Sequence, residues 1–456
     1  MKISAVRIAK YKSIDKGITL NPGDHLSVFV GKNNSGKSTI LDALFRFFRP
    51  LQNPERFIDA EAKIDIDLSL TERDRSELSK LGEPNLPEHI TLSLYGEEAS
   101  FRTDNEQKSF SKPVAQFLIQ KTVRIGAIRD LDFIKMKKLY EEFQTGWQKA
   151  FKLFTSTMLL FFPDVKISSN LFKEKRNGFE TSVKEFGKIR TLERLGLGFR
   201  HLFIILLYYF HPRYDVLLID EPEIHLHPSM IKRLVEVLGS RISNKQIFCT
   251  THSPLFITTE LLPNIHRIVH TKESGTAIYS QPEKTPDSNR LLQELNADNS
   301  EMFLCDHVIL VEGISDRIFL RTLLKRFYTT SKDIKVIPVH GKENIDVYAA
   351  LLNSFSIPFS VMIDKDGLSN SNSKYIRDAL VSAQGENTFD LLKKHGIYVL
   401  PFGQLEDHYP SQYRKPDLSK PLAAASVSEA VNKNDLQKDP IKPIITLLDD
   451  VVKVSD

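Results

Sequence analysis

The sequence predicts an α/β protein made of two successive domains, each containing parallel strands. Apolar strand patterns at 25–30, 216–219 and 246–250 enclose helical segments in the first part of the chain. A regular strand–helix–strand order returns between 307 and 363. Strands that alternate with helices at this spacing are typical of parallel sheets.

In the first part, strands are expected at 3–8, 25–30, 62–70, 90–95, 216–219 and 246–250. A helix is expected at 38–48, where apolar residues recur at helical spacing and Pro50 follows. Residues 130–165 read as long helices of mixed charge. We therefore predict a helical insertion or dimerisation element over about 125–185. The apolar run 202–210 predicts a buried core helix or strand.

The polar stretch 271–300, with Pro282 and Pro286, predicts a linker. Beyond it, strands are expected at 307–311, 334–339 and 359–363, with helices at 315–327 and 344–354. This pattern predicts two domains, at 1–300 and 301–456.

Bulk composition is that of an ordinary globular protein, with 41% hydrophobic and 26% charged residues among 456. A net charge of +4 permits a nucleic-acid partner without indicating one. Two cysteines, Cys249 and Cys305, cannot build a disulfide framework, which favours a reducing, cytoplasmic setting. The longest apolar run falls short of the ~20 residues that span a bilayer, so no membrane association is expected.

A phosphate-binding loop is the clearest local motif. Gly31-x4-Gly36-Lys37-Ser38 fills every fixed position of the P-loop pattern, between a predicted strand and a predicted helix. Backbone N–H groups of such a loop and the positive end of the helix bind phosphates. The residues predicted to bind the nucleotide are Asn33, Asn34, Ser35, Gly36, Lys37, Ser38 and Thr39. Lys37 is expected to reach the β- and γ-phosphates, and Ser38 to bind Mg²⁺.

Two further strands end in polar residues suited to phosphate chemistry. The strand 216–219 is followed by Asp220 and Glu221. Asp220 is predicted to bind the magnesium ion, and Glu221 to orient or deprotonate the attacking water. His252 follows the strand 246–250, at the strand end where α/β sheets place ligand-facing residues.

Together these motifs resemble the ABC ATPases, specifically the branch that includes the SMC and RecF proteins. Asp-Glu-Pro-Glu-Ile-His-Leu-His-Pro (220–228) resembles the extended acidic motif of that branch, and His252 matches its switch histidine. The resemblance covers roughly 1–270 and implies an ABC-type P-loop ATPase domain. It also implies a homodimer or higher homo-oligomer, because these proteins trap ATP between two subunits.

One element departs from that family. Its Ser-Gly-Gly-like signature loop is represented only by Leu195-Gly-Leu-Gly-Phe199, without the serine that contacts the opposite subunit's γ-phosphate. This change leaves ATP binding in place and argues against fast ATP turnover.

Acidic residues follow two strands of the second part. Glu312 ends the strand 307–311, Asp316 lies one helical turn later, and Asp364 and Asp366 follow the strand 359–363. Such carboxylates at strand ends can hold Mg²⁺ for phosphodiester chemistry. An EF-hand is excluded because the glycine comes too early and the twelfth position lacks glutamate.

The order strand–Glu-Gly, helix, strand, helix, strand–Asp-x-Asp resembles the TOPRIM domain, over about 303–410. An ABC-type ATPase domain followed by TOPRIM resembles the OLD (overcoming lysogenisation defect) family. The resemblance assigns metal binding and acid–base roles to Glu312, Asp364 and Asp366, and makes Asp316 a second metal ligand. It further suggests Glu406 as a metal ligand and Lys420 as a catalytic lysine; a solvated surface charge explains each of these two equally well.

Contacts to DNA are harder to place. Basic residues interleaved with phenylalanines between 151 and 200 suggest a phosphate-binding face, although a solvated helical surface fits the pattern at least as well. Arg129 is a weaker candidate for a nucleotide or DNA contact.

The resemblance implies an ATP-regulated endonuclease that uses Mg²⁺ or Mn²⁺ and acts in antiphage defence. Its alternative is an ATP-dependent DNA clamp or sensor that acts through a partner such as a helicase, a reverse transcriptase or an RNA. A strand-passing topoisomerase would need a nucleophilic tyrosine context, which the sequence lacks.

Overall fold

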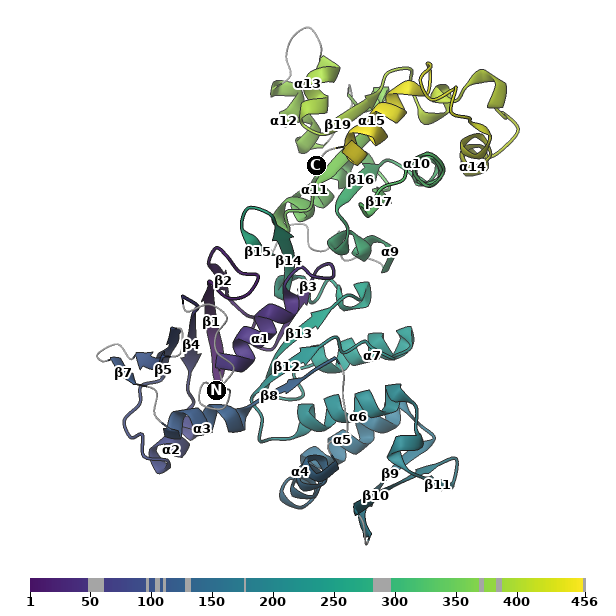
Figure 1. Cartoon of the computed structure of the whole chain (residues 1–456). Helices are drawn as coiled ribbons and strands as arrows, with labels where there is room; N and C mark the ends of the chain where they lie inside the picture. Colours follow the sequence, from purple (N-terminus) through teal and green to yellow (C-terminus); the bar gives the residue numbers. More distant parts are fainter. Residues whose placement is uncertain are drawn as a thin grey trace. The chain divides into compact units, whose positions relative to one another are not determined.

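The computed structural model describes residues 1–47, 61–95, 98–102, 107–109, 112–127, 133–175, 178–281, 297–368, 373–382 and 388–453. The chain forms two compact units, 1–280 and 281–456 (Figure 1). Among the described residues, no helix has both the length and the apolar character needed to cross a membrane.

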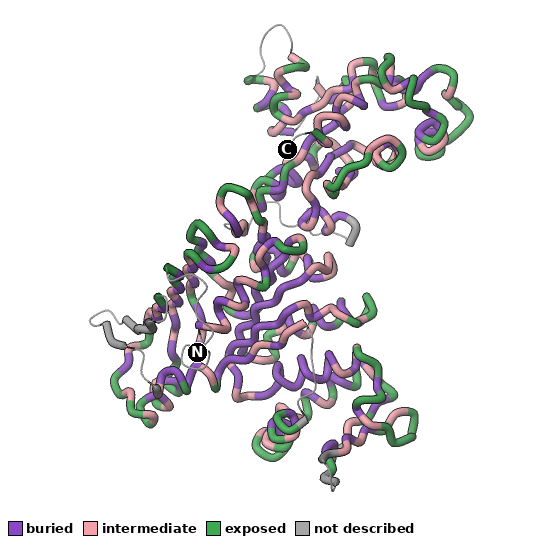
Figure 2. Tube along the Cα trace, in the orientation of Figure 1, coloured by how far each residue is buried: buried purple, intermediate pink, exposed green. Residues whose placement is uncertain are grey.

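The first unit is organised around a six-stranded sheet whose central strands are parallel. Its order is β15 (Gly275–Ser280), β14 (Ile265–Thr271), β3 (Leu26–Val30), β13 (Gln246–Thr251), β12 (Val216–Asp220) and β8 (Thr122–Ile125). Every residue of β3, β12 and β13 is buried, as expected for strands covered on both faces (Figure 2). The carboxyl ends of these three strands meet at one edge.

A second, antiparallel sheet belongs to the same unit. Its order is β2 (Ile18–Leu20), β1 (Lys2–Ala9), β4 (Lys63–Ser69), β5 (His89–Tyr95), β6 (Glu98–Arg102) and β7 (Gln107–Ser109). Alternating apolar residues of β1, β4 and β5 share one core with the helix α1 (Lys37–Phe47) and with Val216, Leu218 and Phe248 of the first sheet. This core fixes the start of α1 against the parallel strands.

Helices complete the first unit: α2 (Glu72–Lys80), α3 (Lys112–Lys121), α4 (Phe133–Gly146), α5 (Gln148–Phe161), α6 (Leu197–Phe210) and α7 (Pro228–Gly239). Figure 1 shows α6 and α5 on the side of the sheet away from α1. The apolar run 202–210 therefore belongs to a core helix, because α6 is buried from Leu202 to Phe210.

The predicted helical insertion over 125–185 is correct only in part. Helices occupy 133–161, but the chain then forms the antiparallel strands β9 (Val165–Lys175), β10 (Gly178–Glu185) and β11 (Lys188–Arg190). The sequence Asn177-Gly178 is a typical hairpin signal. The segments on either side of it carry many charged residues, so the alternation of apolar and polar residues that indicates a strand was not visible in the sequence.

The predicted linker at 271–300 begins too early. Residues 275–280 form β15, which pairs antiparallel with β14, and α9 (Ala297–Ser300) ends the stretch. Thr276 of β15 packs against the phosphate loop, so this strand belongs to the first unit's sheet.

The second unit contains a parallel sheet in the order β17 (Ile334–Pro338), β16 (His307–Val311), β18 (Phe359–Asp364) and β19 (Ile397–Leu400). Its longer helices are α10 (Ile314–Phe327), α11 (Ile345–Ser354), α12 (Lys374–Ser382), α13 (Thr388–Lys394), α14 (Lys420–Ala430) and α15 (Lys442–Lys453). The strand and helix predictions for 307–363 are confirmed to within one or two residues.

Candidate nucleotide and metal sites

The loop between β3 and α1 has a backbone that only glycine fits at two positions. Gly36 has φ +102°, and a Cβ there would lie 2.1 Å from Thr276 Oγ1. A Cβ at Gly31 would lie 2.3 Å from the carbonyl oxygen of Ile268. Asn34 has φ +63°, which asparagine tolerates better than most residues. The loop is therefore shaped by close backbone approach to β14 and β15.

Lys37 begins α1 with a buried side chain whose Nζ donates to the carbonyl oxygens of Gly31 (2.9 Å) and Lys32 (2.7 Å). Burial lowers the pKa of Lys37 to about 8, although nearby carboxylates, Glu221 first among them, act in the opposite direction. The ammonium is thus held inside the loop, where an anion would meet it.

The other predicted nucleotide contacts lie around the same loop. Asn33, Asn34 and Ser38 are exposed, and Thr39 is half-buried and accepts a hydrogen bond from Ser13 Oγ at 3.2 Å. Ser35 is buried, and its Oγ has no hydrogen-bond partner among the described residues.

Asp220 ends β12 beside the loop. Its Oδ1 accepts from Thr250 Oγ1 at 2.7 Å and from Ser38 Oγ at 3.4 Å. Ser38 and Asp220 therefore bring two oxygen ligands together, which suits Mg²⁺. Arg124 of β8 donates to Asp220 Oδ2 at 3.0 Å, a contact that the sequence analysis missed.

Glu221 and His252 follow the neighbouring strands β12 and β13 and lie side by side. The His252 Nε2 is 3.2 Å from Glu221 Oε1. Burial and the charge of Lys37 lower the pKa of His252, which favours the neutral imidazole at pH 7. Glu221 itself has φ +45°, and its N–H donates to the Thr250 carbonyl at 3.1 Å, which fixes the side chain at the sheet edge.

Glu223 supports this pair and was also missed from the sequence. One carboxylate oxygen accepts from Thr251 Oγ1 (2.7 Å) and from the His252 N–H (2.8 Å). Burial raises the pKa of Glu223, while these two bonds act against the rise. Its place in the motif Asp-Glu-Pro-Glu (220–223) was visible, but its partner His252 lies 29 residues away in sequence.

The segment Leu195–Phe199 leads into α6, which begins at Leu197. A Cβ at Gly198 would lie 2.8 Å from the His225 carbonyl oxygen, so this glycine allows close packing on the loop after β12. Leu197 is exposed, so the segment presents an apolar side chain at the start of α6.

In the second unit, three predicted carboxylates come together. Glu312 follows β16, Asp364 ends β18, and these strands pair in parallel, so their carboxyl ends meet. Glu312, Asp364 and Asp366 each offer an oxygen within 4.8 Å of the others. Glu312 Oε1 also accepts from the Asp364 N–H at 3.0 Å, which fixes the first carboxylate against the second strand.

The electrostatics of this group suit a divalent cation. Burial, followed by the charges of Glu312 and Asp316, raises the pKa of Asp364 to about 7. Burial also raises the pKa of Asp316 to about 6. Carboxylates crowded in this way repel one another, and hard oxygen ligands so arranged fit Mg²⁺ or Mn²⁺.

Asp316 is not a member of the three-carboxylate group, although its charge acts on Asp364. Its Oδ2 accepts from the Gly313 N–H at 2.9 Å and caps the start of α10. This bond holds the backbone of Gly313 next to Glu312.

Glu406 and Lys420 contact each other, at 3.3 Å between Nζ and Oε1. Lys420 also donates to Gln404 Oε1 at 2.8 Å, with its side chain 62% exposed. Glu406 lies near enough to Asp316 to add to its raised pKa. The two residues named from the resemblance therefore form one charged pair near the carboxylates.

Lys342 is the charged residue of this site that the sequence analysis missed. Its Nζ lies 2.8 Å from Asp366 Oδ1 and 3.6 Å from Glu312 Oε1. Burial lowers the pKa of Lys342, but the Asp366 bond and the carboxylate charges outweigh burial and raise it. Nothing in the short sequence Gly-Lys-Glu-Asn marks this lysine, because it reaches the site through the sheet order.

The predicted DNA-contacting segment has two kinds of side chain. Many of its phenylalanines are core residues, including Phe154, Phe161, Phe172 and Phe199. Its exposed basic residues include Lys152, Lys166, Lys173, Lys184, Lys188, Arg190 and Arg194. The interleaved pattern thus separates into a core face and an exposed basic face, and the segment is helical only in part, since β9, β10 and β11 lie within it. Arg129 lies outside the described residues.

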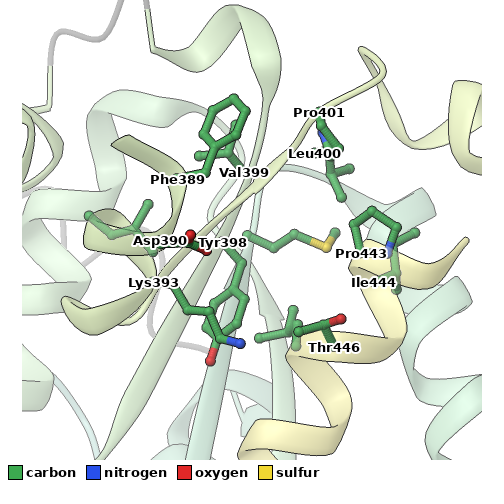
Figure 3. Close-up of a pocket in the computed structure, with 13 residues that line it drawn as sticks. Phe389, Asp390, Lys393, Tyr398, Val399, Leu400, Pro401, Pro443, Ile444 and Thr446 are labelled. Carbon is green, nitrogen blue, oxygen red and sulfur yellow. The ribbon is translucent and has the colours of Figure 1, made fainter. Parts of the chain in front are cut away.

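A separate cavity of about 220 Å³ lies between α13, β19 and α15 (Figure 3). Phe389 and Lys393 line one side, and Pro443, Ile444 and Thr446 line another. Asp450 accepts from Tyr398 Oη at 3.1 Å and pairs with Lys393 at 2.7 Å. The carboxylates of the candidate metal site are not among the residues that line it.

Comparison with known families gives two matches. Residues 26–258, just over half of the chain, match the family described as "AAA domain, putative AbiEii toxin, Type IV TA system". Residues 303–366 match the TOPRIM domain of overcoming lysogenization defect protein-like proteins. The second match ends at Asp366 and includes the three carboxylates.

Several curated proteins are similar in sequence. The Old nuclease of Escherichia phage P2 is 27% identical over 165 residues (34% of this chain, 28% of that protein). Endonuclease GajA of Bacillus cereus strain HuB5-5 is 21% identical over 286 residues (49% and 41%). Protein ea59 of Escherichia phage lambda is 22% identical over 346 residues (68% and 61%). The chain thus covers less than two thirds of each relative.

Among solved structures, the SMC head domain from Thermotoga maritima has a TM-score of 0.40 at 14% identity, over 62% of this chain and all of that one. An SMC head bound to the C-winged helix domain of ScpA has a TM-score of 0.46 at 16% identity, over 64% of this chain and all of that one. The two family matches, with the P-loop and the carboxylates in place, establish the relationship. The chain belongs to the AAA-domain family that its first match describes and is an OLD family protein, with a P-loop ATPase domain followed by a TOPRIM domain.

Proposed function

We propose that the protein is an ATP-regulated DNA endonuclease that uses Mg²⁺ or Mn²⁺ to cut phosphodiester bonds. The observation that carries this proposal is the convergence of Glu312, Asp364 and Asp366 within 4.8 Å at the edge of a parallel sheet. The names of the phage P2 and Bacillus cereus relatives, a nuclease and an endonuclease, support it. A role in defence against phage, in the cytoplasm, is part of the proposal.

In this proposal the three carboxylates hold the cation, which when bound stabilises charge on the phosphate oxygens. Glu312 is already fixed by the Asp364 N–H. Burial and the neighbouring carboxylates raise the pKa of Asp364 in the absence of a cation, and a bound cation would relieve this repulsion. Three further residues would act next to the three carboxylates: Lys420, its partner Glu406, and Asp316.

The ATPase unit would regulate cutting. Lys37, Ser38 and Asp220 would hold the nucleotide and its magnesium, and Glu221 with His252 would orient water at the γ-phosphate. The 3.2 Å contact between Glu221 and His252 supports a shared role. The missing serine at Leu195–Phe199 supports slow ATP turnover. ATP binding in a homodimer would then set whether the enzyme cuts DNA.

Supercoiled plasmid tests the nuclease. Wild-type protein, Asp364→Asn and Asp390→Asn would be incubated with plasmid in Mg²⁺ or Mn²⁺, with and without ATP. Asp390 is an exposed acidic residue of α13 that does not belong to the carboxylate group, and is the matched control. We expect nicked or linear product from the wild type and the control, and none from Asp364→Asn. Equal cutting by all three would refute the site.

The alternative function is an ATP-dependent DNA clamp or sensor that acts through a partner. The departure of Leu195–Phe199 from a Ser-Gly-Gly-like signature loop favours it. In that case Lys37→Ala would abolish DNA association in gel-shift assays, and no metal condition would yield cleavage. Cleavage lost specifically in Asp364→Asn would exclude this alternative.

A further inference from the structure

Lys342 reaches the carboxylate group from a third strand end. The loop after β17 carries it, and β17 pairs in parallel with β16, so its carboxyl end lies next to Glu312. Gly341 has φ +134°, and Asn344 Nδ2 donates to the Val339 carbonyl at 2.8 Å. The loop is thus pinned on both sides of Lys342, and the position of this side chain is set by the fold.

The ammonium of Lys342 lies where a cation bound by these carboxylates would lie. Its Nζ is 2.8 Å from Asp366 Oδ1 and 3.6 Å from Glu312 Oε1, two of the three candidate ligands. Mg²⁺ lies about 2.1 Å from its oxygen ligands. An ion that bound both carboxylates would therefore come into close contact with Nζ, where two positive charges repel.

We propose that Lys342 occupies the cation position of the carboxylate group until its ammonium binds a backbone phosphate of DNA instead. DNA and the cation would therefore bind cooperatively. This inference rests on the proposed nuclease function and adds a substrate-binding residue to that site. The ammonium of lysine is a point charge that binds phosphate well.

The side chain can make this exchange because it is not enclosed. It is 23% exposed, and its partner Asp366 is 66% exposed. Nζ can therefore turn toward solvent, where a phosphate oxygen would replace Asp366 as its partner. The same phosphate can offer an oxygen to the cation, as substrate phosphates do for Mg²⁺.

Two consequences follow from this exchange. Without DNA, Lys342 competes with the cation and weakens its binding. With DNA, the competitor is withdrawn, so cation affinity rises; by linkage, the cation raises DNA affinity by the same factor. Coupling between two ligands typically lies in the range of about 5- to 150-fold, and we expect roughly tenfold here.

The test is titration calorimetry of the full chain with Ca²⁺, without nucleotide, in the presence and absence of a short duplex. Ca²⁺ takes oxygen ligands as Mg²⁺ does and serves as a probe of binding alone. Asp364→Asn identifies the heat that belongs to the carboxylate group. Lys342→Met removes the ammonium, Lys342→Arg retains a positive charge, and Lys325→Met, on the exposed face of α10, is the control for loss of charge.

The wild type and Lys325→Met should gain roughly tenfold in Ca²⁺ affinity when duplex is added. Lys342→Met should bind Ca²⁺ roughly tenfold more tightly than wild type without duplex, and gain nothing from it. Without duplex, Lys342→Arg should bind Ca²⁺ as weakly as the wild type does. Thermal unfolding would verify that each variant is folded.

Unchanged affinity and intact coupling in Lys342→Met would overturn the inference while leaving the metal site in place. Weaker Ca²⁺ binding in that variant would also overturn it, because Lys342 would then be ordering the carboxylates instead of competing. If the wild type shows no Asp364-dependent Ca²⁺ binding with or without duplex, the proposed nuclease site itself is refuted.

Discussion

The guanidinium of Arg124 lies 3.0 Å from the carboxylate of Asp220, the residue proposed to bind magnesium beside the phosphate loop. The same guanidinium pairs with Asp42 of α1, also at 3.0 Å. Arg124 therefore ties the helix behind the loop to the strand β12. It also occupies one oxygen of Asp220 and leaves the other directed toward Ser38 and Thr250.

Arg124→Gln should lower the free energy of unfolding by about 2 kcal/mol, because two partly buried carboxylates lose an ionic partner. Arg46→Gln is the control, since Arg46 also pairs with Asp42 but is on α1 itself. Urea unfolding would compare them. A loss no larger in Arg124→Gln than in Arg46→Gln would contradict a stabilising role for the Asp220 contact.

Gly36→Ala should abolish nucleotide binding. A methyl group there meets Thr276 Oγ1 at 2.1 Å in a backbone with φ +102°, so the loop must move. Gly82→Ala is a matched control, because Gly82 has φ +99° with open space around it. Both variants should lose about 1 kcal/mol of stability from backbone strain. Fluorescent-nucleotide binding would compare them, and equal affinity would argue against the close approach.

Glu223→Ala should lower ATP hydrolysis roughly tenfold or more with little change in ATP binding, because His252 loses its backbone anchor. Glu223→Gln should remain close to wild type, because the amide oxygen can still accept from Thr251 and from the His252 N–H. Steady-state hydrolysis and equilibrium binding would separate the two effects. If Glu223→Gln loses as much ATP hydrolysis as Glu223→Ala, Glu223 acts through its charge and not as a hydrogen-bond acceptor.

The buried His266 should make the first unit less stable in acid. Burial lowers its pKa to about 4, and its ring packs against Phe29. The unfolded chain, with a histidine pKa near 6.5, takes up a proton that the folded chain resists, so stability falls as pH drops below about 6.5. Between pH 7.5 and 5 this group should contribute a loss of about 2 kcal/mol.

His266→Gln should remove that part of the pH dependence. His89→Gln is the control, because His89 is 71% exposed and its substitution should leave the dependence unchanged. Chemical unfolding at pH 7.5 and pH 5 would measure the difference. Parallel pH curves for wild type and His266→Gln would contradict this assignment.

Predictions from sequence succeeded where the signal was local. The phosphate loop, its strand and its helix lie within a few residues of one another, so spacing alone located them at β3 and α1. The carboxylates Glu312, Asp364 and Asp366 followed from strand ends in a parallel sheet. Predictions were weaker between 161 and 190 and between 271 and 280, where charged residues hide short antiparallel strands.

What only the tertiary structure decided is which distant side chains meet at these edges. Lys342 reaches the carboxylates because β17 lies next to β16, and Arg124 reaches Asp220 because β8 lies next to β12. The order of strands in a sheet depends on long-range packing, which neighbouring residues do not encode. The sequence therefore determined the candidate ligand-binding motifs, and the sheet order determined the charges that face them.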